Sequence, residues 1–318
     1  MKIVVLDGHA VNPGDLSWES IEKLGNITVY DRTLPEETLA RVHDAEIILT
    51  NKTIICEKII NNCPNLKYIG VLATGYNVVD LQAAKKAGIV VTNIPGYSTP
   101  SVSQFVFALL LEACSRVQEH NESVHAGDWI KCPDFTYWKY PLVELDGKTL
   151  GIFGFGSIGK SVAKIADAFG MKVICYTRTP SKIPSDSYVK SVSFDELLSE
   201  SDVITLHSPL TEETKNLINT STINKMKDGV IVINTARGPL VNEQDMTKAL
   251  EAGKIACYCA DVISAEPMEK DNPLYKAPNC IITPHIAWAT KEARTRLMEI
   301  ATNNISSFIN GNPINVVN

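Results

Sequence analysis

The sequence predicts an α/β protein with two doubly wound parallel sheets, and three observations lead to that prediction. Short apolar strands alternate with helical segments along nearly the whole chain, which is the pattern of parallel sheets covered by helices on both faces. The chain has 318 residues, more than one domain usually holds. A glycine fingerprint begins only at Gly154, and such a fingerprint normally opens a domain of its own.

The fingerprint follows an apolar strand expected over residues 150–153. Gly154, Gly156 and Gly159 have the spacing G-x-G-x-x-G and lead into a helix expected over 157–169. The first glycine permits a turn, the second lets backbone approach a pyrophosphate, and the third lets the helix pack on the strand. The helix N-terminus presents free N–H groups to phosphate. Because strand and helix flank the glycines in the required order, we favour a dinucleotide site over a turn that serves packing alone.

The returning strand, expected over 171–177, ends at Thr177, where a site for NAD usually carries Asp or Glu to hold the ribose hydroxyls. Arg178 and Thr179 follow. A guanidinium with flanking hydroxyls suits the 2′-phosphate of NADP, since it binds phosphate oxygens in a bidentate fork. A solvated arginine at a strand end explains the residue equally well. The pattern therefore leans towards NADP without excluding NAD.

Composition excludes several classes of protein. The chain is 45% apolar and 21% charged with a net charge of −6, which is typical of a soluble globular protein without general affinity for nucleic acid. Its apolar stretches are too short for a membrane span or a signal peptide. None of the eight cysteines forms a C-x-x-C pair, and no metal-ligand spacing occurs. We therefore expect a cytoplasmic protein with free thiols and no bound metal.

The first 97 residues alternate strands and helices. Strands are expected at 3–6, 28–30, 47–49, 68–72 and 90–92, and helices at 17–24, 36–42, 57–61 and 80–87. Ligands of such sheets bind at the carboxyl ends of the strands. There, Thr74 and Gly75 offer backbone N–H groups to a small anion, although a plain turn is nearly as good an explanation. Lys52, after the third strand, is expected to be a solvated loop lysine.

A long apolar helix is expected from 101 to about 118, begun by Thr99 as N-cap and Pro100. The next segment, 125–141, is rich in aromatic residues: Trp129, Phe135, Tyr137, Trp138 and Tyr140. Aromatic residues are enriched at subunit interfaces. A packed arm within one subunit remains the alternative, and we favour the interface.

After the fingerprint, further strands are expected at 203–206, 230–234, 256–262 and 280–283, which makes six parallel strands with the first two. The loops at their carboxyl ends carry candidate site residues: His207, Arg237, Asp261, Glu266 and His285. A final amphipathic helix is expected from 291 to 310, and Gly311 ends it.

An Arg, a carboxylate and a His beside a nicotinamide site indicate hydride transfer to a carbonyl that neighbours a carboxylate. Arg237 would bind the carboxylate bidentately and polarise the carbonyl. His285 would donate a proton to the forming alkoxide, and Glu266 would favour the charged, proton-donating imidazole. Each assignment is weak alone, because a single His or Arg is more often a satisfied hydrogen-bonding residue. Their joint placement favours the catalytic reading.

The chain resembles the D-isomer-specific 2-hydroxyacid dehydrogenases, and within them is similar to the glycerate dehydrogenase or hydroxypyruvate reductase group. The resemblance covers essentially the whole length. It rests on these motifs: GVLATGYNVVD at 70–80, GFGSIG at 154–159, HSPLTEET at 207–214, NTARG at 234–238, DVISAEP at 261–267 and TPHIAWAT at 283–290.

The resemblance implies roles for residues in these motifs. Catalysis is implied for Arg237, Glu266 and His285. Substrate binding is implied for Thr74, Gly75, Arg237, His285 and, from a partner subunit, Trp138. Cofactor binding is expected for Gly154, Phe155, Gly156, Ser157, Ile158, Gly159, Thr177, Arg178, Thr179, His207, Pro209, Thr214, Thr235, Ala236, Asp261 and Ala287. Of these, Thr177, Arg178 and Thr179 rest on the residues alone, because Thr177 departs from the family, in which many relatives have Asp. Asp261 would contact the nicotinamide amide.

The resemblance also implies a Rossmann cofactor domain, residues 98–285, inserted into a smaller flavodoxin-like substrate domain made of 1–97 plus 286–318. Family members are homodimers. Glu266 argues against the formate dehydrogenase branch, which has Gln there. The expected activity is NAD(P)-dependent reduction of a small 2-keto acid, hydroxypyruvate or glyoxylate first, to the D-2-hydroxy acid. The alternative is a dinucleotide-sensing module of the corepressor type. The sequence gives it little support, because no basic or peptide-binding extension is present.

Overall fold

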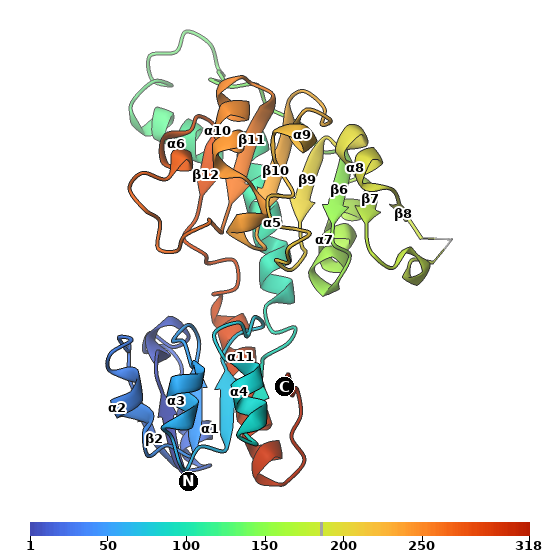
Figure 1. Ribbon diagram of the computed structural model, residues 1–318. Helices are drawn as coiled ribbons and strands as arrows, with labels where there is room; N and C mark the ends of the chain where they lie inside the picture. Colours follow the sequence, from blue (N-terminus) through green and yellow to red (C-terminus); the bar gives the residue numbers. More distant parts are fainter. Residues whose placement is uncertain (185–186) are drawn as a thin grey trace. The chain divides into compact units, whose positions relative to one another are not determined.

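A computed structural model describes residues 1–184 and 187–318 and divides the chain into two compact units (Figure 1). Unit 1 consists of Met1–Ser98 and Trp288–Asn318, and unit 2 of Thr99–Ala287. The division lies within two residues of the boundaries expected at 97/98 and 285/286. Both units contain a purely parallel sheet, so the predicted fold class is confirmed.

Unit 1 has a five-stranded sheet of order β2-β1-β3-β4-β5. Its strands are β1 (Lys2–Val5), β2 (Asn26–Val29), β3 (Ile47–Thr50), β4 (Tyr68–Val71) and β5 (Val90–Thr92). Its helices are η1 (Gly8–Ala10), α1 (Glu19–Glu22), α2 (Thr38–Val42), α3 (Glu57–Asn61), α4 (Leu81–Lys86) and α11 (Lys291–Ile309). Every strand and helix expected in the first 97 residues is present, with ends shifted by up to about two residues.

The C-terminal helix α11 covers one face of this sheet. Its spacing of apolar residues buries Ala293, Leu297, Ala301 and Ile305 completely or almost completely, in one cluster with the strand residue Ile3. Burying a leucine such as Leu297 stabilises the fold by roughly 1.5–3 kcal/mol. The helix begins where the Thr290 side chain accepts a hydrogen bond from the Ala293 N–H. The amphipathic helix expected from the sequence thus packs its apolar side on the sheet, except at its last residue, Ile309, which is 40% exposed.

Unit 2 has a seven-stranded sheet of order β12-β11-β10-β9-β6-β7-β8. The strands are β6 (Thr149–Phe153), β7 (Lys172–Tyr176), β8 (Val189–Ser191), β9 (Val203–Leu206), β10 (Val230–Asn234), β11 (Ile255–Ala260) and β12 (Cys280–Ile282). The helices are α5 (Thr99–Ser115), α6 (Val117–His125), α7 (Ser157–Ala168), η2 (Pro180–Lys182), α8 (Phe194–Glu200), α9 (Thr220–Ile223), η3 (Gly238–Leu240), α10 (Glu243–Glu251) and η4 (Pro273–Lys276).

Helix α8 was not expected from the sequence, and two further features of unit 2 differ from the sequence expectation. The sheet has a seventh strand, β8, of only three residues with an exposed lysine at its centre, so it carries no apolar run from which to predict it. The helix expected over 101–118 is two helices, because Arg116 lies between them with φ +50°. A left-handed residue interrupts the i to i−4 hydrogen-bond ladder and turns the chain.

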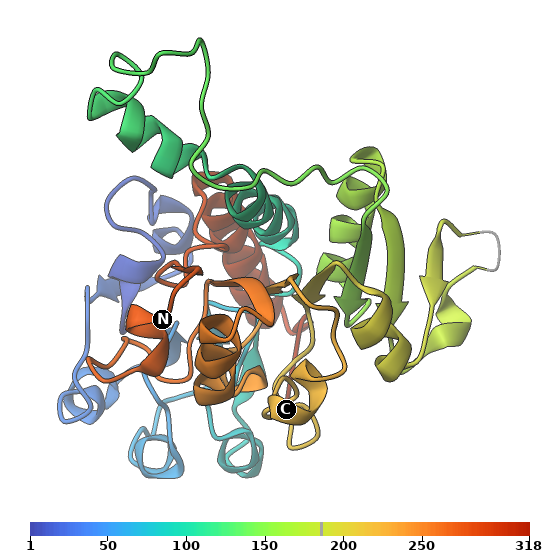
Figure 2. The ribbon, with the colours of Figure 1, turned by 90° about the horizontal axis from the view of Figure 1, so that it is seen from above.

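After α6, residues 126–143 form an extended loop, called the arm below, which stands off from the sheet of unit 2 (Figure 2). Large apolar side chains of the arm are exposed: Trp129, Ile130, Phe135, Trp138, Tyr140, Leu142 and Val143. Phe135 is 89% and Ile130 88% exposed. Several large apolar side chains exposed in one segment are a feature typical of interaction surfaces.

Candidate active site

The three glycines of the turn between β6 and α7 have different surroundings. Gly154 has φ +96°, and a Cβ there would lie 2.6 Å from the His207 carbonyl oxygen. A Cβ on Gly159 would lie 2.3 Å from the Gly154 carbonyl oxygen. A Cβ on Gly156 would meet nothing within 4 Å. Gly154 and Gly159 are thus required by packing, whereas Gly156 borders open space at the N-terminus of α7, where a pyrophosphate could approach.

Two buried hydroxyl oxygens have no hydrogen-bond partner among the residues that the structure describes: Ser208 Oγ, in the loop that meets this turn, and Thr235 Oγ1 after β10. Ser208 follows β9 and Thr235 follows β10. These two strands are neighbours, and their last residues, Leu206 and Asn234, lie opposite each other. Buried polar atoms are nearly always satisfied, so these two hydroxyls indicate a polar ligand at this edge of the sheet. Together with the open space at Gly156, they show that the residues fit a dinucleotide. Ser208 was not among the predicted site residues, although it lies inside the HSPLTEET motif.

His207 lies at the end of β9, and its Nε2 is 2.9 Å from the hydroxyl of Thr205. Burial lowers the pKa of His207 to about 3, so its imidazole is neutral at physiological pH. The following loop is closed by Thr214, whose hydroxyl donates to the Pro209 carbonyl at 2.9 Å. His207 therefore offers a neutral hydrogen-bonding group to a ligand, without a charge.

At the end of β7, the Thr177 hydroxyl accepts a hydrogen bond from the Thr179 N–H at 3.3 Å, and Arg178 is exposed. A hydrogen bond from the Thr211 hydroxyl lowers the pKa of the Glu213 carboxyl, and the charge of Arg178 lowers it further. Arg178 thus follows β7, the strand next to β6 in the sheet, and its charge acts on Glu213.

The loop that follows β10 is fixed by Asn234, whose side chain is fully buried. Asn234 Nδ2 donates to the Arg237 carbonyl at 2.9 Å, and Oδ1 accepts from the Ala236 N–H at 3.0 Å. The guanidinium of Arg237 is exposed and donates to the Ala236 carbonyl at 2.7 Å. Asn234 was not predicted as a site residue, because the sequence does not show which way its amide points.

His285 and Glu266 form a close pair in unit 2. The Nδ1 of His285 lies 2.7 Å from Oε2 of Glu266. The loop of Glu266 touches the loop of Arg237, because a Cβ on Gly238 would lie 1.9 Å from the Ile263 carbonyl carbon. The structure thus brings the loops of the three predicted catalytic residues to one edge of the sheet, at the carboxyl ends of β10, β11 and β12.

Asp261 is 1% exposed and holds the loop of His285 in place. Its Oδ1 accepts from the Thr283 hydroxyl at 2.7 Å and the Ile286 N–H at 2.9 Å, and its Oδ2 from the Ala287 N–H at 2.8 Å. Burial raises the pKa of Asp261, and these hydrogen bonds oppose that shift. The observed contacts give Asp261 a structural role in addition to the expected contact with nicotinamide.

In unit 1, Thr74 and Gly75 lie in the loop after β4. The Thr74 hydroxyl donates to the Ile94 carbonyl at 2.9 Å. Among the described residues, no atom accepts a hydrogen bond from the backbone N–H of Thr74 or Gly75. Both groups are therefore available to an anion. Trp138 lies in the arm of unit 2 and is 66% exposed.

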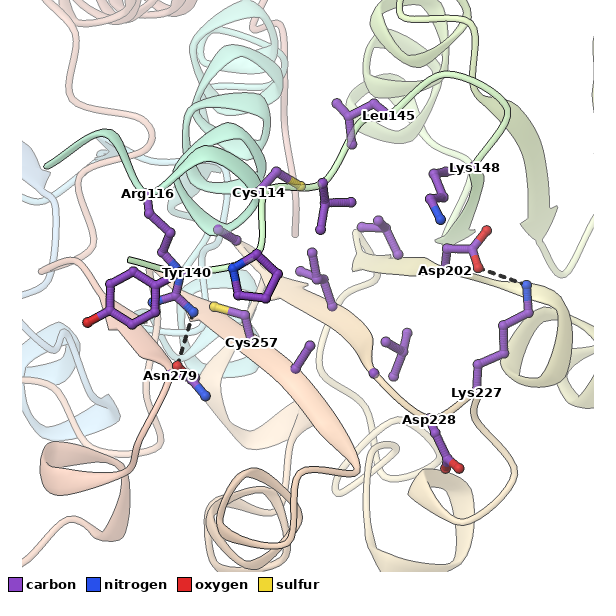
Figure 3. Close-up of a pocket in the computed structure, with 18 residues that line it drawn as sticks. Cys114, Arg116, Tyr140, Leu145, Lys148, Asp202, Lys227, Asp228, Cys257 and Asn279 are labelled. Carbon is purple, nitrogen blue, oxygen red and sulfur yellow. Dashed lines mark hydrogen bonds and ion pairs between the residues drawn. The ribbon is translucent and has the colours of Figure 1, made fainter. Parts of the chain in front are cut away.

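A cavity of about 440 Å³ in unit 2 lies at the opposite, amino-terminal edge of the sheet (Figure 3). It is lined by the end of α5, the last residues of the arm and the chain that follows it, and the starts of β9 to β11. Its rim carries the ion pair Lys227–Asp202 at 2.9 Å. Dinucleotides bind at the carboxyl ends of parallel strands, so this cavity is not the cofactor site.

Metal clusters and membrane-spanning helices are both absent from the described residues. Over 1–184 and 187–318, no group of three or more His, Cys, Asp or Glu side chains could hold a metal ion. No helix in the same ranges is long and apolar enough to cross a membrane.

Comparison with known proteins identifies the family. The family model of the D-isomer specific 2-hydroxyacid dehydrogenase NAD binding domain matches residues 107–287. The hydroxypyruvate reductase of Blautia hydrogenotrophica is 54% identical over 100% of both chains. The glycerate dehydrogenase of Methylorubrum extorquens is 43% identical over 89% of this chain and 88% of its own.

A solved structure shows the same fold over the whole chain. An acyclic imino acid reductase in complex with NADPH and D-Arg superimposes with a TM-score of 0.87 at 31% identity, covering 100% of both chains. Together with the glycine turn and the unpartnered hydroxyls, these matches bear out the predicted family, fold and NAD(P) cofactor. The chain belongs to the D-isomer specific 2-hydroxyacid dehydrogenase family and is an NAD(P)-dependent oxidoreductase that acts on CH–OH groups.

Proposed function

We propose that this dehydrogenase reduces a small 2-keto acid, hydroxypyruvate or glyoxylate first, to the D-2-hydroxy acid. The observation that carries the proposal is the pair His285–Glu266, 2.7 Å apart, beside the loop of Arg237. The hydroxypyruvate reductase and glycerate dehydrogenase among the relatives support this choice of substrate.

Each residue of the site has a defined task in this proposal. Arg237 binds the substrate carboxylate and polarises the adjacent carbonyl. Nδ1 of His285 faces Glu266, so Nε2 is the nitrogen that donates a proton to the carbonyl oxygen. Bound NAD(P)H supplies the hydride. The free N–H groups of Thr74 and Gly75 hold the carboxylate in place.

The cofactor contacts follow the predicted motif residues. The N–H groups at the start of α7 bind the pyrophosphate beside Gly156, and Ser208 joins Thr235 among the hydroxyls that contact the dinucleotide. Arg178, flanked by Thr177 and Thr179, binds the 2′-phosphate, which gives the enzyme a preference for NADP. A relative of the same fold is bound to NADPH.

The proposal also covers the oligomeric state and the cellular location of the enzyme. The exposed apolar side chains of the arm form the interface of a homodimer, and Trp138 of one subunit reaches the active site of its partner. The free cysteines are in keeping with a cytoplasmic enzyme: all eight are unpaired in the described chain.

One assay tests the proposed function. Oxidation of NADPH and NADH is followed with hydroxypyruvate, glyoxylate, pyruvate and longer 2-keto acids. Turnover is expected to be fastest with hydroxypyruvate and glyoxylate. Tight binding of NAD(P)H without turnover on any substrate of the panel would contradict the proposal and favour a dinucleotide sensor.

A further inference from the structure

In unit 1, the carboxylate of Asp7 closes the loop that follows β3. Its Oδ1 accepts from the Asn51 N–H at 2.7 Å, and its Oδ2 accepts from the N–H groups of Lys52 at 2.6 Å and Thr53 at 2.8 Å. The Thr53 hydroxyl adds a hydrogen bond at 3.1 Å. Three consecutive N–H groups around one anion form the kind of nest that binds phosphate in other folds. Here the chain fills the nest with its own carboxylate.

Asn51 connects the loop after β3 to the loop after β4. Its side chain is buried, with the residue 4% exposed, and its Nδ2 donates to the Leu72 carbonyl at 2.7 Å. The Leu72 N–H in turn donates to the Thr50 carbonyl at 2.8 Å. Leu72 is therefore held at both its N–H and its carbonyl, shortly before Thr74 in the chain.

The loop of Thr74 is held on its other side by the chain after β5. The Ile94 N–H donates to the Ala73 carbonyl at 2.9 Å, and Asn93 Nδ2 donates to the Thr74 carbonyl at 2.8 Å. The carbonyls of Ala73 and Thr74 and the Thr74 hydroxyl are thus hydrogen-bonded. The N–H groups of Thr74 and Gly75 donate to none of the described residues. The network fixes the loop and leaves the anion-binding groups available.

We infer that Asp7 and Asn51 are positioning residues, which hold residues 73–75 in the conformation that presents their N–H groups to the substrate carboxylate. The inference rests on the proposed function. Neither side chain touches the substrate in this account; Asp7 acts through residues 51–53 and Asn51 through Leu72. Misplacement of a binding group by about 1 Å can lower catalytic efficiency roughly a hundredfold, so a network of short hydrogen bonds matters at this loop.

The test compares Asn51→Ala with Asn12→Ala. Asn12 is also a buried asparagine of unit 1, 7% exposed, and its Nδ2 donates to a backbone carbonyl, that of Leu16, at 2.9 Å. The hydrogen bonds of the Asn12 side chain to the described residues lie within residues 12–16. Asn12→Ala therefore shows how much KM changes when unit 1 is destabilised without any change at the loop of Thr74. We expect Asn51→Ala to raise KM for the 2-keto acid about 10- to 100-fold, with a smaller change in kcat. Asn12→Ala should leave KM within about twofold.

Binding of NADH, followed by fluorescence, gives a second readout, because the cofactor residues lie in unit 2. Its Kd should be unchanged in both variants. Equal effects of the two variants on KM, or a parallel loss of NADH binding in Asn51→Ala, would overturn the inference. Turnover of no 2-keto acid by the unmodified enzyme would instead contradict the proposed function itself.

Asp7→Asn provides an independent variant should Asn51→Ala not fold. It keeps one acceptor oxygen but loses the charge that three N–H groups share, so KM should rise while the Kd for NADH stays the same. Asp80→Asn is its control, since the Asp80 side chain accepts from the Ala83 N–H at 3.0 Å at the start of α4. An unchanged KM in Asp7→Asn, or the same rise in both variants, would contradict the role of Asp7.

Discussion

Nδ1 of His285 lies 2.7 Å from Oε2 of Glu266, and the backbone of His285 has φ +54°. A non-glycine residue in this left-handed region is uncommon and costs of order 1 kcal/mol or more. The hydrogen bonds of Asp261 to the N–H groups of Ile286 and Ala287 hold the chain in this conformation. The Glu266 carboxylate accepts from Nδ1–H, which leaves Nε2 as the nitrogen that faces a substrate and, in the imidazolium form, donates the proton.

Replacing His285 by Ala should lower kcat for 2-keto acid reduction by about a hundred- to ten-thousand-fold, the range of a positioned general acid. The Kd for NADH, measured by fluorescence, should change little, because all the predicted cofactor contacts except Ala287 lie on other loops. His125→Gln, at an exposed histidine at the end of α6, is the control. Undiminished turnover would remove His285 from the mechanism.

Glu266→Gln should lower kcat less than His285→Ala, since the amide still accepts the Nδ1 hydrogen bond but carries no charge. Glu266 acts through His285, so the double variant should be no slower than His285→Ala alone. Additive losses in this double-mutant cycle would show that Glu266 has a task independent of the imidazole.

The fold was largely predictable because its signals are local. The apolar strand, glycines and amphipathic helix over 150–169 occupy adjacent positions in the sequence, and each has a periodic or turn signature. Strand β8 lacks such a signature, since it has three residues and lies at the sheet edge. The break at Arg116 was equally hidden, because an arginine with φ +50° looks like an ordinary helix residue in the sequence.

Only the residues of the candidate site that belong to sequence motifs or follow a predicted strand could be predicted from the sequence. Arg237, Glu266 and His285 could be singled out because they follow strands of one sheet. Asp261 holds the loop of His285 through the N–H groups of Ile286 and Ala287, 25 and 26 positions further along the chain, and no local sequence pattern gives such contacts. Asn234 bonds backbone groups only two and three positions on, which is a local turn pattern of asparagine that the sequence could have indicated.

His207 should make the protein acid-sensitive. Its pKa in the folded protein is about 3, below the value of about 6.5 for an unfolded chain. The unfolded state therefore binds a proton that the folded state excludes, so stability is retained above about pH 6.5 and falls as the pH drops towards about 3. At about pH 5 the loss is about 2 kcal/mol. His207→Gln, which keeps a hydrogen bond to Thr205, should flatten this dependence in thermal unfolding from about pH 7.5 to 5, whereas His125→Gln should not.

Arg178→Ala should weaken NADPH binding about 10- to 100-fold, as expected for loss of a charge-assisted hydrogen bond to phosphate. The Kd for NADH should stay within about twofold, because NADH has no 2′-phosphate. Lys190→Ala, which removes an exposed cation from the neighbouring strand β8, is the control for general electrostatic attraction. Equal weakening of both coenzymes would show that Arg178 is only a surface residue.

Two alanine substitutions in the glycine turn should have different effects: Gly159→Ala should lower stability, and Gly156→Ala should weaken cofactor binding. An alanine at Gly159 would place its Cβ 2.3 Å from the Gly154 carbonyl oxygen, and overpacking of this kind costs about 1–3 kcal/mol. Gly156 has φ −80° and ψ −160°, which alanine adopts without strain, and its Cβ would meet nothing within 4 Å. Gly156→Ala should therefore keep the stability within about 0.5 kcal/mol but weaken NADH and NADPH alike, because the new methyl group occupies the approach of the pyrophosphate. Thermal unfolding and fluorescence titration of the two variants distinguish these effects. Unchanged coenzyme affinity in Gly156→Ala would place the pyrophosphate elsewhere than at the N-terminus of α7.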